Sequence, residues 1–217
     1  MIAHPSPNFG ERRNGATPRF IVLHYTAMAS AQAALERLCD PDAEVSAHYL
    51  IGRDGTAWQL VDERKRAWHA GAGAWGACTD INSNSIGIEL DNSGDCPFAE
   101  PLMARLEALM QAIMARHGIA ADGVIGHSDM APGRKVDPGP RFDWLRLEQQ
   151  GLAAPRGIHP DPENATMDRF RSRARAVGYT ADVGDEALLS AVRLRFRPGA
   201  LGPLTGADLT PLSRPGL

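Results

Sequence analysis

Lysine is almost absent from this chain of 217 residues, because only Lys65 and Lys135 among its 23 basic residues are lysine. The formal net charge is −3, and no stripe of basic residues is visible along the sequence. Nucleic acid is therefore not expected as a partner, since proteins that bind it usually carry such a stripe. Lys135 lies in the most polar loop of the chain. Either that loop needs a compact ammonium group, or lysine is there by chance.

Long hydrophobic runs are also missing. No segment approaches the ~20 apolar residues of a transmembrane helix, and MIAHPSPNFGERRNG at the N-terminus has no apolar signal-peptide core. Cys39, Cys78 and Cys96 are odd in number and unclustered, which favours free thiols over disulfides or a CxxC zinc site. We therefore expect a cytoplasmic monomer without a membrane partner. A misplaced start codon, or export by a phage-type route, would change the expected compartment.

Short apolar runs and one amphipathic segment predict an α/β fold. Strands are expected at residues 20–23, 47–51, 56–61, 86–90 and 124–125, and helices at 31–39, 101–117 and 142–150. Gly52–Gly55 marks a hairpin, Ser30 suits a helix N-cap, and Gly118 suits a left-handed helix end. Because strands and helices interleave, we expect a central mixed β-sheet flanked by helices.

Charge and composition change near residue 152. Residues 1–151 hold 14 basic and 19 acidic residues, and residues 152–217 hold 9 basic and 7 acidic residues. Residues 152–165 contain prolines and little periodicity, which indicates a linker. We therefore expect a main domain at 1–151 and a small helical extension at 166–217, with helices over 166–177 and 185–195. The extension is too small to bury a generous core alone.

Gly126–Pro140, GHSDMAPGRKVDPGP, is the densest polar segment of the chain. Three prolines and three glycines interrupt it, so regular helix is not expected there. It follows a predicted strand end and carries His127, Lys135 and Asp137. Polar groups on a rigid loop at the end of a core strand are typical of a functional site.

A second histidine, His24, ends another buried strand, just after Phe20–Leu23. Together with His127 and Asp137 it offers two imidazoles and one carboxylate, a set that suits Zn²⁺ and leaves a fourth position for water. Zinc lowers the pKa of such a water to ~7, which provides a nucleophile at neutral pH. A histidine at a strand end is more often a surface or capping residue, so the spacing alone leaves zinc as one interpretation among several.

Glu89 is a carboxylate inside the apolar segment IGIEL, where burial without a partner is unfavourable. Either it forms a structural ion pair, or it faces a site and acts as a general base. Lys135 is either an oxyanion-stabilising group or a solvated loop residue. We expect His69, Asn84 and Arg134 to contact the substrate. For His69 a hydrogen bond within its own loop is an equal alternative, and Arg134 also suits a supporting contact to the ligands.

Five segments of the chain carry a resemblance to a known family. They span residues 20–140 in order: IVLHYTA, SAHYLIGRDG, RAWHAG, NSIGIEL and GHSDMAPGRKVDPGP. Together they resemble the zinc-dependent N-acetylmuramoyl-L-alanine amidases, whose fold is shared with the peptidoglycan-recognition proteins. The AmpD-like branch is the most similar.

The resemblance implies a site and a reaction. It places the zinc ligands at His24, His127 and Asp137, the catalytic glutamate at Glu89 and the electrostatic catalyst at Lys135. The implied reaction is hydrolysis of the amide between N-acetylmuramic acid, or its 1,6-anhydro form, and L-alanine of the stem peptide. The implied partners are muropeptides released during recycling or turnover of the cell wall.

Two alternatives remain at this point. Some proteins of this fold bind wall fragments without cleaving them after losing a zinc ligand, although this chain keeps all the expected residues. The extension, through Phe170–Gly178 and Leu188–Pro198, weakly resembles a peptidoglycan-binding module. It is otherwise a helical segment that packs against the main domain.

Overall fold

The structure, a computed structural model, describes residues 1–158 and 164–213. Its main sheet has the strand order β1-β5-β4-β7-β3-β8. The six strands are β1 (Ile2–Ala3), β5 (Ala57–Gln59), β4 (Tyr49–Ile51), β7 (Ser85–Leu90), β3 (Phe20–Tyr25) and β8 (Val124–Gly126). Only the β4–β5 hairpin is antiparallel, so the sheet is mixed and mostly parallel, which confirms the predicted fold class. A two-stranded sheet joins β2 (Phe9–Glu11) to β6 (Lys65–Ala67).

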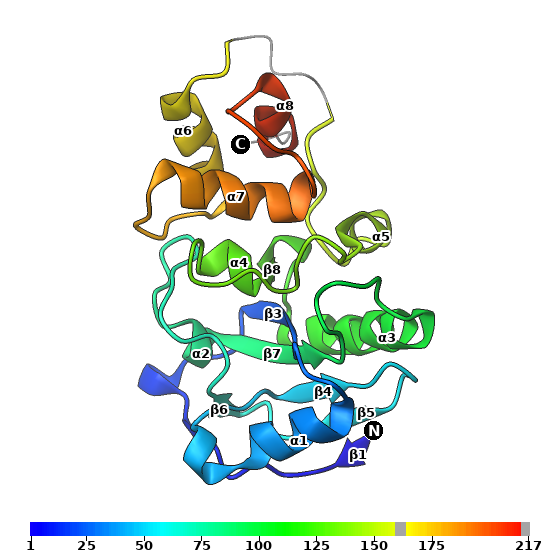
Figure 1. Ribbon diagram of the computed structural model, residues 1–217. Helices are drawn as coiled ribbons and strands as arrows, with labels where there is room; N and C mark the ends of the chain where they lie inside the picture. The colour runs from blue at the N-terminus through cyan, green and yellow to red at the C-terminus, as the bar shows by residue number, and fades with distance from the viewer. Residues whose placement is uncertain (159–163, 214–217) are drawn as a thin grey trace.

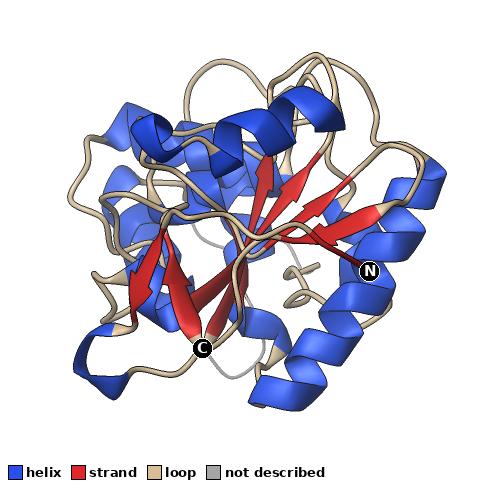
Figure 2. Ribbon diagram, turned by 90° about the horizontal axis from the view of Figure 1, so that it is seen from below, coloured by secondary structure: helices blue, strands red, loops and turns tan. Residues whose placement is uncertain are grey.

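Helices lie on both sides of the main sheet (Figure 2). The longest, α3 (Glu100–His117), packs on one face, where its apolar stripe meets Ile21, Leu23, Ile86 and Ile88. Gly118 ends this helix in the left-handed conformation with φ 64°, as the sequence predicts. Helix α5 (Trp144–Gln149) adds Trp144 and Leu147 to the same core.

The opposite face of the sheet is covered in two parts. Helix α1 (Ala31–Cys39), capped by the Ser30 hydroxyl, packs over β4 and β5 through Leu35, Leu38 and Leu50. Helices α6 (Met167–Val177) and α7 (Asp185–Phe196) cover the β3–β8 end, where Phe170 and Val192 share a core with Val22 and Ile125. The candidate site lies on this face of the sheet, between the two groups of helices.

The C-terminal segment forms one end of the molecule. Figure 1 shows α6, α7 and α8 (Gly206–Leu209) grouped above α4 (His127–Met130) and α5. The linker expected at 152–165 stays a prediction: residues 152–154 are buried beside α5, and residues 159–163 lie outside the described residues. None of the helices in the described ranges is long and apolar enough to cross a membrane. Cys39, Cys78 and Cys96 are all free thiols.

Short 3-10 turns and one further helix complete the fold. They are α2 (Ile81–Asn84), η1 (Arg13–Gly15), η2 (Pro41–Ala43), η3 (Ala121–Gly123) and η4 (Thr210–Leu212). Helix α2 matters most for the site, because it leads directly into β7 and ends the polar connector that begins near His69.

Candidate active site and metal centre

Strand β3 places His24 in the interior because its side chains alternate between the two faces of the sheet. Ile21 and Leu23 point into the α3 core, whereas Val22 contributes to the core under α6 and α7. His24 follows Val22 on that second face and is 1% exposed. The second-last position of β3 thus carries a buried imidazole in place of an apolar side chain.

Strand β7 lies beside β3 with His24 opposite Glu89 in register. Its apolar residues Ile86, Ile88 and Leu90 face the α3 core. The alternate residues of SIGIEL are therefore Ser85, Gly87 and Glu89, and they face the same side as His24. The segment is thus a two-faced strand, with a polar, small-residue face toward the site.

The segment Gly126–Pro140 brings two further candidate ligands to this place. One feature differs from expectation, because His127–Met130 forms a single turn of α-helix, α4. The turn is possible because Gly126 serves as its N-cap and the prolines come only later, from Pro132 onward. The loop then returns, and Ser128 N donates to the Asp137 carbonyl at 2.9 Å. This bond holds Asp137 beside His127.

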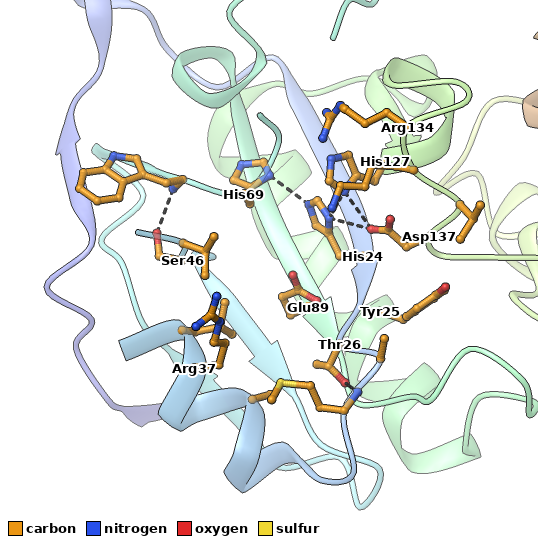
Figure 3. Close-up of a pocket in the computed structure, with 18 residues that line it drawn as sticks. His24, Tyr25, Thr26, Arg37, Ser46, His69, Glu89, His127, Arg134 and Asp137 are labelled. Carbon is orange, nitrogen blue, oxygen red and sulfur yellow. Dashed lines mark hydrogen bonds and ion pairs between the residues drawn. The ribbon is translucent and has the colours of Figure 1, made fainter. Parts of the chain in front are cut away.

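The three predicted ligands meet at one point (Figure 3). His24 Nδ1 lies 2.9 Å from His127 Nδ1, and Asp137 Oδ2 lies 3.0 Å from each of these nitrogens. All three residues are buried. Among the residues described, they form the one group of His, Cys, Asp or Glu side chains close enough together to hold a metal ion.

The hydrogen bond made by Nε2 of each imidazole determines whether Nδ1 of the same ring carries a proton or a lone pair. His127 Nε2 donates to the Ala70 carbonyl at 2.9 Å, so in the neutral ring Nδ1 carries a lone pair. The second ring, His24, is connected to Ser85 through His69. Ser85 Oγ donates to the Ile81 carbonyl at 2.6 Å, so it accepts from His69 Nε2 at 3.1 Å. His69 Nδ1 must then accept from His24 Nε2 at 3.0 Å.

Because the neutral His24 ring carries its proton on Nε2, its Nδ1 has a lone pair as well. Burial and the nearby His127 lower the pKa of His24 to about 4, so the ring is neutral at pH 7. With both rings in the neutral form, two imidazole lone pairs and a carboxylate oxygen face one another at 2.9–3.0 Å. Such an arrangement is repulsive unless a cation lies at its centre. Tetrahedral Zn²⁺ would separate its ligand atoms by about 3.3 Å, so the donor set fits.

Glu89 and Lys135 line the cleft in front of this cluster. The cleft has a volume of about 400 Å³ and lies between α1 and the loop after α4 (Figure 3). Glu89 Oε2 is buried and has no hydrogen-bond partner within the described residues. Burial and, after it, the Asp137 carboxylate raise the pKa of Glu89 to about 8. The predicted alternative, a structural ion pair of Glu89, is not formed with any residue in the described ranges.

Lys135 is half-buried and lines the same cleft. No carboxylate of the residues that the structure describes lies within 4.0 Å of its ammonium group. Its backbone N–H donates to the Ala131 carbonyl at 3.1 Å, which fixes the main chain two residues before Asp137. The side chain is therefore free to face a bound molecule.

The three residues expected to bind substrate lie differently. His69 lines the cleft, but both of its ring nitrogens are used by His24 and Ser85. Arg134 also lines the cleft, and Nη2 donates to the Ala70 carbonyl at 2.6 Å. Asn84 is not among the residues lining this cleft; its Nδ2 donates to the Asp80 carbonyl at 2.9 Å. Its substrate role stays a prediction that this geometry does not support.

Two polar residues that hold the site were not identified from the sequence. Asn82 Oδ1 accepts from the N–H groups of His69 and Ala70, at 3.1 and 2.8 Å, and so shapes the connector beside the cluster. Ser85 anchors His69 as described above. The alternation of SIGIEL was a usable signal for Ser85, since it places Ser85 on the face of Glu89. Nothing local in the sequence marks Asn82.

Comparison with known proteins identifies the family. The N-acetylmuramoyl-L-alanine amidase family matches residues 14–140, more than half of the chain, and that range includes all five proposed metal and catalytic residues. The chain belongs to this family. The amidase AmiD of Escherichia coli is 41% identical to this chain over 159 residues, which are 64% of this chain and 56% of AmiD. The match thus spans little more than half of that relative's length.

One further relative and one solved structure bear on the fold. The 1,6-anhydro-N-acetylmuramyl-L-alanine amidase AmpD of Enterobacter cloacae is 36% identical over 160 residues, 66% of this chain and 86% of AmpD. A structure of Escherichia coli AmiD with anhydro-N-acetylmuramic acid-L-Ala-D-gamma-Glu-L-Lys aligns with a TM-score of 0.80 and 31% identity, covering 94% of this chain and 95% of that chain. The fold of this chain, including its C-terminal helices, therefore matches that of AmiD.

Proposed function

We propose that this protein is a zinc-dependent hydrolase of the bond between N-acetylmuramic acid, or its 1,6-anhydro form, and L-alanine of peptidoglycan stem peptides. The observation that carries the proposal is that three candidate ligand atoms, from His24, His127 and Asp137, lie within 3.0 Å of one another in the interior. The names and bound substrate of the relatives support the choice of substrate.

His24, His127 and Asp137 would hold the ion. When bound in such a site, Zn²⁺ polarises a carbonyl and lowers the pKa of a coordinated water to ~7. Glu89 faces the same cleft, so its carboxylate takes the proton of the attacking water and passes it to the leaving amine. Because its pKa is raised toward neutrality, the same group can accept and return a proton. The free ammonium of Lys135 stabilises the oxyanion that develops on the substrate carbonyl.

The proposal is tested by metal analysis together with Glu89→Gln. Wild-type protein is expected to bind one equivalent of zinc and to lose activity when the metal is chelated. Glu89→Gln keeps the size and hydrogen-bonding capacity of the side chain, so zinc content should stay the same while turnover falls by roughly 10²–10⁴-fold. Full activity after chelation would refute zinc dependence, and unchanged turnover would remove Glu89 from the base role. Muropeptide binding without any hydrolysis by zinc-loaded wild type would favour a recognition protein.

The compartment is proposed to be the cytoplasm, with released muropeptides as substrate. The three free thiols support this, because disulfides are rare in a reducing compartment. Parallel assays with soluble anhydro-muropeptides and with intact sacculi separate the two settings. Faster release of peptides from anhydro-muropeptides is expected, whereas preferential cleavage of sacculi would point to an enzyme acting on the intact wall.

A further inference from the structure

The carboxylate of Asp129 is fully buried, only two residues after His127 in α4. Its Oδ2 accepts from Gly126 N at 2.8 Å and from Arg195 Nη1 at 2.6 Å. Its Oδ1 accepts from the Tyr179 hydroxyl at 2.6 Å. Two of these three donors come from the C-terminal extension, Tyr179 just after α6 and Arg195 near the end of α7.

Arg195 is built into the main domain. Its side chain is 3% exposed, and the guanidinium lies 4.0 Å from the centre of the Trp144 ring. Both terminal nitrogens also lie 3.3 Å from the Val124 carbonyl, in the strand that leads into α4. Arg195 therefore contacts the first residue of β8, the Trp144 ring in α5, and α4, the helical turn that carries His127.

The extension also holds the loop on the other side of His127. Gly76 N donates to the Gly178 carbonyl at 2.9 Å, and the Thr180 hydroxyl donates to the Gly76 carbonyl at 2.7 Å. Trp75 packs edge-on against Tyr179 with ring centres 4.9 Å apart. This loop begins at Ala70, whose carbonyl accepts from His127 Nε2.

Close packing leaves little freedom at this junction. A Cβ on Gly178 would lie 2.4 Å from the Trp75 ring, and φ there is +124°, so a side chain is excluded on both counts. The ends of α4 and of the loop are also joined, because Ala74 N donates to the Met130 carbonyl at 2.8 Å. Figure 1 shows α7 lying directly against α4.

We propose that the C-terminal extension is a working part of the metal centre, in which Arg195 and Tyr179 are positioning residues that hold Asp129 and thereby His127. The proposal rests on the metal-dependent function proposed above. A buried carboxylate without its cation is strongly unfavourable. Without Arg195, α4 would shift to bring Asp129 to water, and His127 would leave the position shared with His24 and Asp137.

The test measures Zn²⁺ affinity of the full-length protein by competition with a chromophoric chelator. Arg195→Met keeps an unbranched apolar side chain and removes the charge, and it should weaken Zn²⁺ binding by about 10–100-fold. Arg195→Lys restores a positive charge next to Asp129 and should recover most of the lost affinity. Turnover of saturating muropeptide should fall together with the affinity.

Arg193→Met is the matched control. Arg193 lies on the same helix and forms an ion pair at 2.8 Å with buried Asp208, entirely within the extension. This control breaks a buried ion pair without touching α4, and Asp208 keeps Arg197 as a second partner at 2.5 Å. The urea midpoint should therefore fall while Zn²⁺ affinity stays within about threefold of wild type. The comparison distinguishes a loss of stability from a loss of positioning.

Tyr179→Phe provides a milder second test, because it removes one hydrogen bond to Asp129 and keeps the ring against Trp75. We expect at least threefold weaker Zn²⁺ binding, and this variant decides the matter if Arg195→Met does not fold. Unchanged Zn²⁺ affinity in folded variants overturns the proposal, as do equal losses in Arg195→Met and Arg193→Met. Failure of wild type itself to bind Zn²⁺ would refute the proposed function instead.

Discussion

The proton of the neutral His24 ring is held on Nε2 by residues that do not touch the proposed metal position. Ser85 fixes His69, and His69 fixes His24, through two hydrogen bonds of 3.1 and 3.0 Å. Burial and, after it, the neighbouring His24 lower the pKa of His69 well below its usual value, so the intermediate ring is neutral. Such outer contacts orient a ligand ring and raise its basicity.

His69→Phe tests the hydrogen-bond relay that runs from Ser85 through His69 to His24. The change keeps a flat ring but removes both nitrogens, so His24 Nε2 loses its acceptor and the ring is free to turn. Zn²⁺ affinity, measured by chelator competition, should fall about 10–100-fold. The same substitution at exposed His4 should leave the affinity unchanged. Equal affinities of His69→Phe and wild type would show that the relay does not orient His24.

At the level of a single element, the two faces of strand β7 have different roles. One face closes the α3 core with Ile86, Ile88 and Leu90, and the other presents a carboxylate and a serine to the site. Gly87 lies between them on the site face, where a Cβ would be 2.5 Å from the His69 ring. The absence of a side chain at this position makes the room that His69 occupies.

Gly87→Ala should therefore disturb both stability and the site. The added methyl group pushes His69 away from His24, and overpacking of this kind typically lowers the free energy of unfolding by about 1–3 kcal/mol. Urea unfolding and Zn²⁺ competition measure the two effects. Gly184→Ala is the control, because Gly184 has open space around it and φ of −68°. A Gly87→Ala protein with wild-type stability would mean that the strand and ring adjust freely.

At the scale of the whole molecule, a row of histidines fills the interior between α1 and the extension. The rings of His127, His24, His69 and His48 contact one another edge-on in that order, with centres 4.5, 5.1 and 5.8 Å apart. Burial and then the Arg12 charge lower the pKa of His48 to about 3. Each ring with a depressed pKa resists protonation in the folded protein but takes a proton readily once the chain unfolds.

This row predicts that metal-free protein is sensitive to acid. For His48 the folded pKa of about 3 lies below the ordinary 6.5, so its stabilising contribution is complete above pH 6.5 and is lost as the pH falls toward 3. His48→Asn removes that titration and keeps an acceptor for Gly87 N. Between pH 7 and pH 5 it should lose about 2 kcal/mol less unfolding free energy than wild type.

Urea titrations with chelator present at both pH values provide the measurement. Glu63, whose pKa is lowered to about 2 by its partners Arg116, Tyr49 and His117 despite burial, has the same sign but acts only below its ordinary value of 4.5. It therefore does not interfere in this range. Equal losses in wild type and variant would mean that His48 is not protonated differently in the two states.

Local patterns were sufficient for much of the fold. The apolar runs, the hairpin signal of Gly52–Gly55 and the caps Ser30 and Gly118 predicted elements that the structure contains, because these signals act within a few residues. The turn α4 was missed, since prolines later in the segment concealed a short helix before them. His69 was left undecided because its partners, His24 and Ser85, are 45 and 16 residues away.

The chemical groups of the site could be named from the sequence, namely two imidazoles and a carboxylate at strand and loop ends, and a glutamate in a buried strand. Their arrangement depends on long-range packing. Parallel pairing sets His24 beside Glu89, and the return of the loop brings Asp137 to His127. The extension then pairs the charge of Asp129. These contacts join residues up to 113 positions apart, so no local pattern encodes them, and packing and burial bring them together.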